Sequence, residues 1–188
     1  MCRKRLSLVL PGVLLLLILT CLAPSGVAQQ VPENSLAPYV PSPETVVEKM
    51  LKLANVKAGD TVYDLGCGDG RIIIMAAQKF GAKAVGVELN DELFKKTSER
   101  IKELKLQDKV TMIHGDLLQV DLSPATVVTL YLLRSSNEKL KPNLEKYLKK
   151  GTRVVCHDYG VAGWTPEKTE VIPSEDTNHK STLYLYRR

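Results

Sequence analysis

Two hydrophobic patterns alternate along the chain. Short apolar runs, which fit strands buried on both faces, are separated by longer segments whose apolar residues recur every three or four positions, as on one side of a helix. We therefore predict strands and helices in alternation. The strands are predicted in 59–66, 82–89, 109–116, 125–133 and 152–160, and the helices in 43–56, 71–81, 91–106 and 137–151.

This alternation favours a parallel sheet with helices on both faces. The tail, 167–188, contains two strand-like runs around a polar turn, which predicts an antiparallel pair. We therefore predict an α/β fold that is Rossmann-like and doubly wound, with a mostly parallel seven-stranded sheet and a C-terminal antiparallel strand pair. The chain of 188 residues is long enough for one such domain, which we assign to 44–188. Pro142 is expected to break the last helix early.

The first 28 residues have the layout of a secretory signal. A basic start at residues 3–5 precedes the apolar run 6–22, and small residues follow up to Ala28. We predict a signal peptide or membrane anchor over 1–28 and a proline-rich arm over 29–43. The charge distribution predicts a domain exported to, or anchored on, the outside of the cytoplasm, with membrane association through the first segment. An organelle presequence is the alternative.

The charge balance argues against a nucleic-acid partner. The net charge is +5, but three basic residues lie in the first 28, and beyond them 23 basic residues face 21 acidic ones. Two cysteines, Cys67 and Cys156, lie beyond that segment, and they indicate neither a disulfide framework nor a metal site. The histidines are too scattered to provide metal ligands at a recognisable spacing, so we expect no metal.

The segment YDLGCGDGRI, which begins at Tyr63, carries three glycines at alternate positions directly after a predicted strand. Gly66, Gly68 and Gly70 allow the backbone to turn tightly and to approach a ligand closely. The helix that follows offers free N–H groups, and ligands of α/β sheets bind at this edge. The spacing G-x-G-x-G is one residue shorter than that of a dinucleotide site. These features predict a small ligand held by the loop.

Acidic residues surround this loop. Asp64 and Asp69 flank it, which suits a positively charged ligand such as an ammonium or a sulfonium better than a pyrophosphate. Glu88 ends the second strand about twenty residues further on, where an acid accepts the hydroxyls of a ribose. Asp116 ends the third strand, on the same edge, and can accept from an adenine amino group. Together these acids predict a nucleoside ligand that carries positive charge.

The motifs DLGCGDGR, VGVELN and HGD resemble those of class I S-adenosylmethionine-dependent methyltransferases over residues 44–160. With PYVPSPETVVEKML they resemble the small seven-strand protein-lysine methyltransferases. These include the mitochondrial enzymes that methylate the adenine nucleotide carrier or a component of ATP synthase, and their bacterial relatives. The resemblance implies S-adenosyl-L-methionine as the cofactor and a protein lysine as the methyl acceptor. We expect a monomer.

The resemblance also implies roles for individual residues. In it Asp64 lies by the methionine moiety, Glu88 holds the ribose, and Tyr39 closes over the cofactor. The full predicted cofactor set is Tyr39, Asp64, Gly66, Gly68, Asp69, Gly70, Glu88, Asn90, Asp116 and Leu117. Tyr131, His157 and Asp158 are the catalytic candidates on the acceptor side.

The chain departs from these families at two places. Ser42 stands where the lysine methyltransferases usually have Thr, and TLYLLRSS lacks the Asn/Asp-Pro-Pro-Tyr motif of many amino-group methylases. Other functions therefore remain open: a non-catalytic nucleoside-binding protein, a methyltransferase for a small molecule, an aminopropyltransferase or a dinucleotide oxidoreductase. The short glycine spacing argues against the oxidoreductase, and the absence of an acid in 131–134 argues against the aminopropyltransferase.

Overall fold

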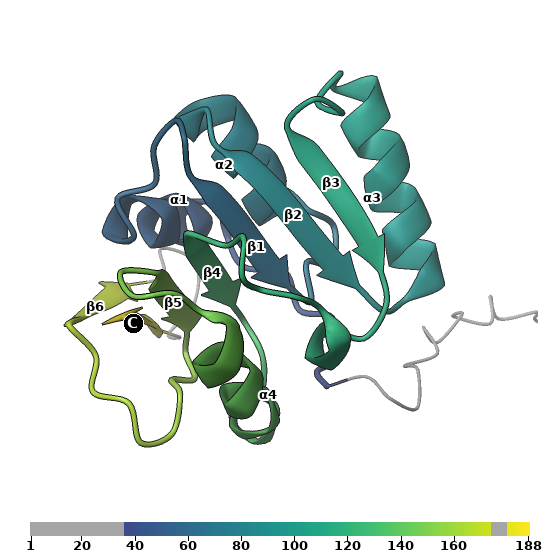
Figure 1. The fold of residues 1–188 in the computed structure, drawn as a ribbon. Helices are drawn as coiled ribbons and strands as arrows, with labels where there is room; N and C mark the ends of the chain where they lie inside the picture. Colours follow the sequence, from purple (N-terminus) through teal and green to yellow (C-terminus); the bar gives the residue numbers. More distant parts are fainter. Residues whose placement is uncertain (1–35, 174–179) are drawn as a thin grey trace, which may run out of the picture. The chain divides into compact units, whose positions relative to one another are not determined.

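The structure, a computed structural model, describes residues 36–173 and 180–188. In this part of the chain seven strands form one sheet in the order β3-β2-β1-β4-β5-β7-β6 (Figure 1). Strands β1 to β5 are parallel, and β7 lies antiparallel between β5 and β6. The predicted fold is confirmed. The strands are β1 Thr61–Leu65, β2 Lys83–Glu88, β3 Val110–His114, β4 Val127–Leu130, β5 Arg153–His157, β6 Lys168–Pro173 and β7 Lys180–Arg187.

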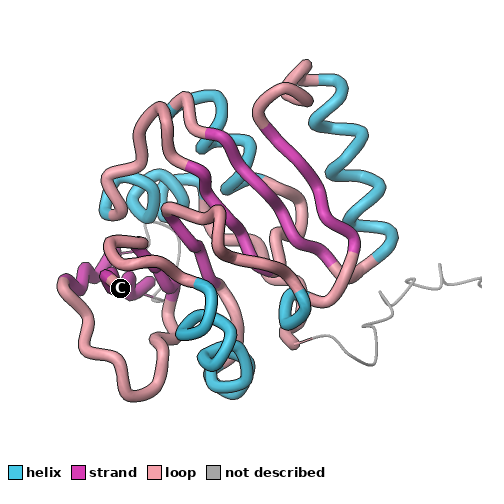
Figure 2. Tube along the Cα trace, in the orientation of Figure 1, coloured by secondary structure: helices cyan, strands magenta, loops and turns pink. Residues whose placement is uncertain are grey.

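Helices cover both faces of the sheet (Figure 2). They are α1 Glu44–Leu53, α2 Arg71–Phe80, α3 Asp91–Glu103, the short 3-10 helix η1 Leu117–Gln119 and α4 Arg134–Tyr147. Buried residues of α1, α2 and α3 form one apolar cluster, and those of η1 and α4 form another. Successive residues of a strand contribute to opposite clusters, as Val127 and Val128 do. This explains why the strands read as continuous apolar runs.

The last helix differs from its prediction. Helix α4 begins at Arg134, three residues before the predicted start, and it continues through Pro142 instead of breaking there. Leu140 and Leu144, one on each side of the proline, are fully buried against the sheet. Their packing offsets the backbone hydrogen bond that proline cannot donate. The predicted polar turn of the tail, residues 174–179, lies outside the described residues.

A buried ion pair at the beginning of β1 joins three parts of the chain. The carboxylate of Asp60 accepts hydrogen bonds from the Lys57 backbone N–H, at 2.9 Å, and from the Thr126 hydroxyl, at 2.8 Å. It also pairs with the Arg153 guanidinium at the start of β5. Burial by itself would raise the pKa of Asp60, but the bonds from Thr126, Arg153 and the Lys57 N–H, together with the charge of Arg153, outweigh it and hold the pKa below its usual value.

Replacing Asp60 by alanine is expected to lower the free energy of unfolding by about 3 kcal/mol, because it leaves the charge of the largely buried Arg153 without a carboxylate, although the guanidinium keeps its bonds to the carbonyls of Ala54 and Asn55. Urea unfolding followed by circular dichroism measures the change. Asp91→Ala is the matched control, since Asp91 forms an exposed pair with Lys95 on α3 and its loss should change little. Equal losses in the two variants would contradict the prediction.

Candidate functional site

The candidate site lies where the order of the strands reverses. Strand β1 pairs with β2 on one side and with β4 on the other, and all three run parallel. The loops that follow them therefore leave from the same edge of the sheet. The registers Leu65↔Val87 and Glu88↔His114 bring the ends of β1, β2 and β3 together at this edge. This is the position at which open α/β sheets bind ligands.

The glycine loop between β1 and α2 needs its glycines for backbone conformation and for space. Gly66, Gly68 and Gly70 all have left-handed φ angles, of 81°, 54° and 74°. A Cβ on Gly68 would lie 2.6 Å from the ring of Tyr39, and one on Gly70 would lie 2.5 Å from Cγ2 of Thr97. The loop thus passes close under an aromatic ring of the arm.

Glu88 connects the glycine loop to the next strand. Its side chain is buried, and its two carboxylate oxygens accept from the backbone N–H groups of Gly68 and Asn90, each at 2.8 Å. Asn90 in turn caps α3 by accepting from the Leu93 N–H at 3.0 Å. Each carboxylate oxygen can accept more than one hydrogen bond, so Glu88 keeps the capacity to accept from ribose hydroxyls.

Asp64 is the buried carboxylate of the site. It accepts from the Thr129 hydroxyl at 2.7 Å, and only 3% of the residue is exposed. Burial raises the pKa of Asp64 to about 7, with smaller contributions from the charges of Glu88 and Asp69. A positively charged ligand would stabilise the ionised form, so this environment suits a cationic group such as a sulfonium or an ammonium.

Asp69 is paired within the protein. Its carboxylate accepts from the Arg71 guanidinium at 3.0 Å to Nε and 2.6 Å to Nη2. Arg71 also donates from Nη1 to the backbone carbonyl of Ser42, at 2.5 Å. The charge of Asp69 is therefore matched by Arg71, and among the acids at this loop Asp64 and Glu88 are the ones suited to a cationic nucleoside.

The loop after β3 is also attached to Glu88. The Gly115 N–H donates to the backbone carbonyl of Glu88 at 3.0 Å, and the Asp116 carboxylate accepts from the Leu118 N–H at 2.9 Å. This bond starts η1, an element that the hydrophobic pattern does not predict, and η1 buries Leu117. Asp116 and Leu117 thus lie next to the end of β2, where residues around an adenine are expected.

The three acceptor-side candidates meet at the ends of β4 and β5. The rings of Tyr131 and His157 stack with centroids 3.9 Å apart, and Oδ2 of Asp158 lies 3.5 Å from Nε2 of His157. His157 is almost completely buried, with Nδ1 2.8 Å from the Ser42 hydroxyl and Nε2 2.9 Å from the Ser181 hydroxyl. Burial raises the pKa of Tyr131, so its phenol stays protonated near neutral pH.

Several site residues have no signal in the sequence that would have found them. Thr97 donates to the Gly68 carbonyl at 2.8 Å, and Thr129 donates to Asp64. A threonine on the buried face of a helix or strand has no pattern that separates it from core residues. Ser42 stands out in the sequence only as a departure from the family, and its contact with His157 joins positions 115 apart in the chain.

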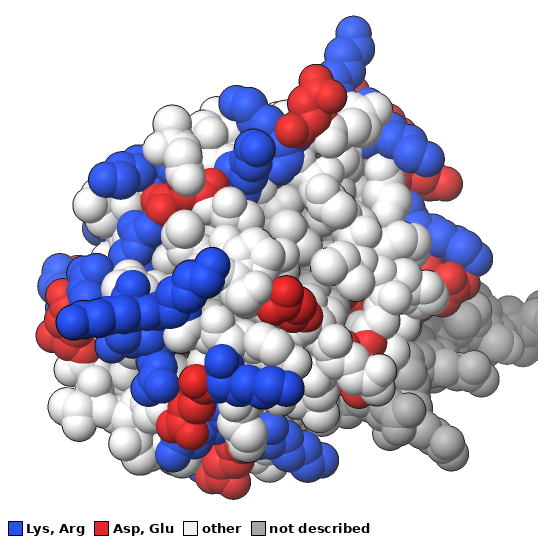
Figure 3. All heavy atoms as spheres, in the orientation of Figure 1, with Lys and Arg blue, Asp and Glu red and all other residues white. Residues whose placement is uncertain are grey.

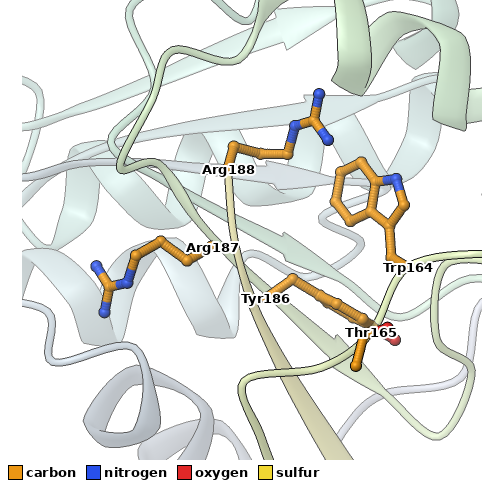
Figure 4. Close-up of a pocket in the computed structure, with 5 residues that line it drawn as sticks. All are labelled: Trp164, Thr165, Tyr186, Arg187 and Arg188. Atoms are coloured by element: carbon orange, nitrogen blue, oxygen red, sulfur yellow. The ribbon is translucent and has the colours of Figure 1, made fainter.

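A hollow on the surface lies away from the candidate site, at the end of β7. Trp164 and Arg188 point toward each other, with the guanidinium 4.7 Å from the ring centroid, whereas Arg187 points away (Figure 4). The pairing Arg153↔Arg187 places it beside the beginning of β5, and thus at the opposite edge from the glycine loop. Figure 3 shows Lys and Arg gathered near β6 and the C-terminal end, with acidic groups beside them.

The glycine loop, the buried acids Asp64 and Glu88 and the sheet order agree with a methyltransferase that depends on S-adenosylmethionine, and the comparisons with known proteins show this class. Residues 64–168 match the family model for the ANTKMT methyltransferase domain, and the chain belongs to this family. It is 53% identical over 150 residues to a protein-lysine N-methyltransferase of Saccharolobus islandicus, covering 79% of this chain and 92% of the relative.

Two further relatives agree with this class. A lysine N-methyltransferase of Rattus norvegicus, named for an ATP synthase component as its substrate, is 33% identical over 132 residues, and the match covers 70% of this chain and 60% of the rat protein. The crystal structure of an RNA methyltransferase from Salinibacter ruber, in complex with S-adenosyl-L-homocysteine, is 45% identical with a TM-score of 0.73. It covers 79% of this chain and 93% of the Salinibacter chain.

The prediction that the domain lies outside the cytoplasm is wrong. The finding that overturns it is the match to the archaeal protein-lysine N-methyltransferase, which covers 79% of this chain. A methyltransferase also needs S-adenosylmethionine, which is made in the cytosol. The signal-like segment 1–28 lies outside the described residues, and no finding supports a signal peptide or a membrane association. In residues 36–173 and 180–188, no helix is long and apolar enough to cross a membrane.

Proposed function

We propose that this methyltransferase transfers a methyl group to the ε-amino group of a protein lysine. The observation that carries the proposal is the 53% identity to a protein-lysine N-methyltransferase, of which the chain covers 92%. The relative from rat, which also has a lysine substrate, supports the same acceptor class. In both the acceptor is a protein side chain.

The cofactor side of the mechanism rests on this chain's own residues. When bound, S-adenosylmethionine supplies an electrophilic methyl group on a sulfonium. We assign Glu88 to the ribose hydroxyls, Asp64 to the positively charged methionine end, and Asp116 with Leu117 to the adenine. Gly66, Gly68 and Gly70 shape the loop, with Asn90, Asp69 and Tyr39 as its supporting residues.

On the acceptor side, methyl transfer depends more on aligning the nucleophile with the methyl group than on general acid–base catalysis. An in-line displacement needs the nucleophile held in line in a place drier than bulk water. We assign the wall of the acceptor channel to Tyr131, whose ring His157 supports by stacking. The carboxylate of Asp158, which adds to the effect of burial in raising the pKa of Tyr131, brings negative charge toward an incoming lysine ammonium. Deprotonation of that ammonium precedes transfer, and water or a carboxylate can accept the proton.

A labelling experiment tests the acceptor class. The full chain is incubated with S-adenosylmethionine that carries an isotopically labelled methyl group and with an extract of cells that lack the protein. Protein, RNA and small molecules are then separated, and the protein fraction is hydrolysed. We expect the label in methylated lysine, and Glu88→Ala should show far less at the same concentration of S-adenosylmethionine. Label in the small-molecule fraction alone would contradict the proposal.

RNA is the second candidate acceptor, because the Salinibacter relative at 45% identity is described as an RNA methyltransferase. The sequence TLYLLRSS at the end of β4 argues against it, since it lacks the Asn/Asp-Pro-Pro-Tyr motif of many amino-group methylases. If the label is released by nuclease and not by protease, and is recovered in RNA nucleosides, RNA replaces lysine as the proposed acceptor.

We also propose that residues 44–188 form the methyltransferase domain, that the preceding residues from 29 form an arm, and that the protein is a monomer. Limited proteolysis that leaves residues 44–188 together in one resistant fragment would support the boundary. Sedimentation at the mass of one chain, 20.8 kDa, would support the monomer.

A further inference from the structure

Ser42, the last polar residue of the arm before α1, contacts both sides of the site. It is buried, with 4% of the residue exposed. Its hydroxyl lies 2.8 Å from Nδ1 of His157 at the end of β5, and its carbonyl accepts from Nη1 of Arg71 at the start of α2. A single residue of the arm is thus bonded to the acceptor side and to the cofactor side.

On the cofactor side the contact continues into the glycine loop. The Arg71 guanidinium donates three hydrogen bonds to the Asp69 carboxylate, and Tyr39, three residues before Ser42, lies with its ring against Gly68. The charges of Asp69 and Arg71 also act on the hydroxyl of Tyr39. Ser42 and Tyr39 thus both contact this part of the molecule, Ser42 through Arg71 and Tyr39 at Gly68.

On the acceptor side the contact continues into β4 and β7. His157 has both ring nitrogens within hydrogen-bond distance of a hydroxyl, those of Ser42 and Ser181. Its ring stacks on Tyr131 and is held on both edges. Because the imidazole is buried and bound on both sides, it cannot turn without breaking one of these bonds.

We propose that Ser42 and His157 form a latch that positions the arm, residues 36–43, over the glycine loop and so increases the affinity for S-adenosylmethionine. Both are positioning residues, which act through Arg71 and Tyr39. Loss of the Ser42 hydroxyl removes its bond to Nδ1 of the buried His157 and so weakens the attachment of the arm, which Arg71 and Ser136 still hold through the backbone carbonyls of Ser42 and Leu36. The inference rests on the dependence on S-adenosylmethionine and not on the identity of the acceptor.

The test compares Ser42→Ala with Ser42→Thr, which keeps the hydroxyl. Calorimetric titration of S-adenosylmethionine into the full chain should show a Kd about 10-fold higher for Ser42→Ala, as expected for one buried hydrogen bond, and little change for Ser42→Thr. Amide hydrogen exchange in residues 36–43 should rise only in the alanine variant. Ser98→Ala is the control, because the Ser98 hydroxyl is buried without a hydrogen-bond partner in the described structure.

Unchanged affinity for Ser42→Ala would overturn the latch, as would a weaker affinity that Ser42→Thr shares. The latch would also be overturned if Ser42→Ala lowered the melting temperature but left both the Kd and the amide hydrogen exchange of residues 36–43 unchanged. The contact would then have a purely structural role. These readouts are independent of the acceptor. If the wild-type protein binds the cofactor but labels no lysine, the proposed acceptor fails and the latch is still tested.

Discussion

Replacing Glu88 by alanine is expected to weaken S-adenosylmethionine binding by about 100-fold or more. The carboxylate accepts from the Gly68 and Asn90 N–H groups, so its removal breaks the side-chain link between the glycine loop and β2 and also removes the acceptor that we propose for the ribose. Hydrogen bonds to a charged group contribute roughly 1.5–3 kcal/mol each, and two of them correspond to a change of at least this size. Calorimetric titration of the full chain measures it.

Two variants make this result interpretable. Glu92→Ala removes an exposed acid of α3 that pairs with Lys96, and it should bind the cofactor as the wild type does. Glu88→Gln keeps the shape but not the charge, and its affinity should fall between those of wild type and Glu88→Ala. Circular dichroism establishes that each variant is folded. A folded Glu88→Ala protein with the wild-type Kd would remove Glu88 from the site.

The affinity for S-adenosylmethionine should fall about 100-fold between pH 8 and pH 5. The pKa of Asp64 is raised to about 7, so the carboxylate is mostly ionised at pH 8 and roughly one hundredth ionised at pH 5. Because a cationic ligand binds the ionised form, its apparent affinity follows that fraction. Asp64→Asn should bind S-adenosylmethionine weakly at both pH 8 and pH 5. Any change in its affinity between the two pH values would come from titration of the ligand and not of Asp64. A wild-type Kd that does not vary with pH would contradict the assignment.

The same raised pKa has the opposite effect on the stability of the ligand-free protein. Between the unfolded value of 3.8 and about 7, the folded state holds a proton that the unfolded state has lost. The contribution of Asp64 to the free energy of unfolding is therefore present below pH 4 and is lost as the pH rises to about 7. Asp64→Asn should flatten this part of the curve relative to wild type, as measured by urea unfolding across this range.

Much of the site was predictable because its parts are local. The glycines of the loop are separated by single residues. Parallel strands bring their carboxyl ends to one edge, so recognising the alternation of strands and helices was enough to bring Glu88 and Asp116 to the loop. The structure agrees at Gly68 and Glu88, which share a hydrogen bond.

Other features depended on partners that local pattern does not reveal. Asp69 looked like a second carboxylate for a cationic ligand, but Arg71 two residues later folds back and pairs with it. Pro142 looked like a break in the last helix, but Leu140 and Leu144 hold the helix against the sheet. The contacts of Leu140 and Leu144 reversed the expectation for Pro142, and the pairing with Arg71 leaves Asp69 a predicted site residue whose charge is already matched.

By itself, the sequence determined the order of strands and helices, the glycine loop and the acids at the strand ends. Backbone conformation and the spacing of apolar residues depend on residues that are neighbours in the chain. Only the tertiary structure decided that Ser42 bonds to His157 and that Thr129 bonds to Asp64. It also decided that Asp64 is buried deeply enough to raise its pKa to about 7. These contacts join segments that are far apart in the chain. They form only when the strands have paired and the helices have packed on the two faces of the sheet.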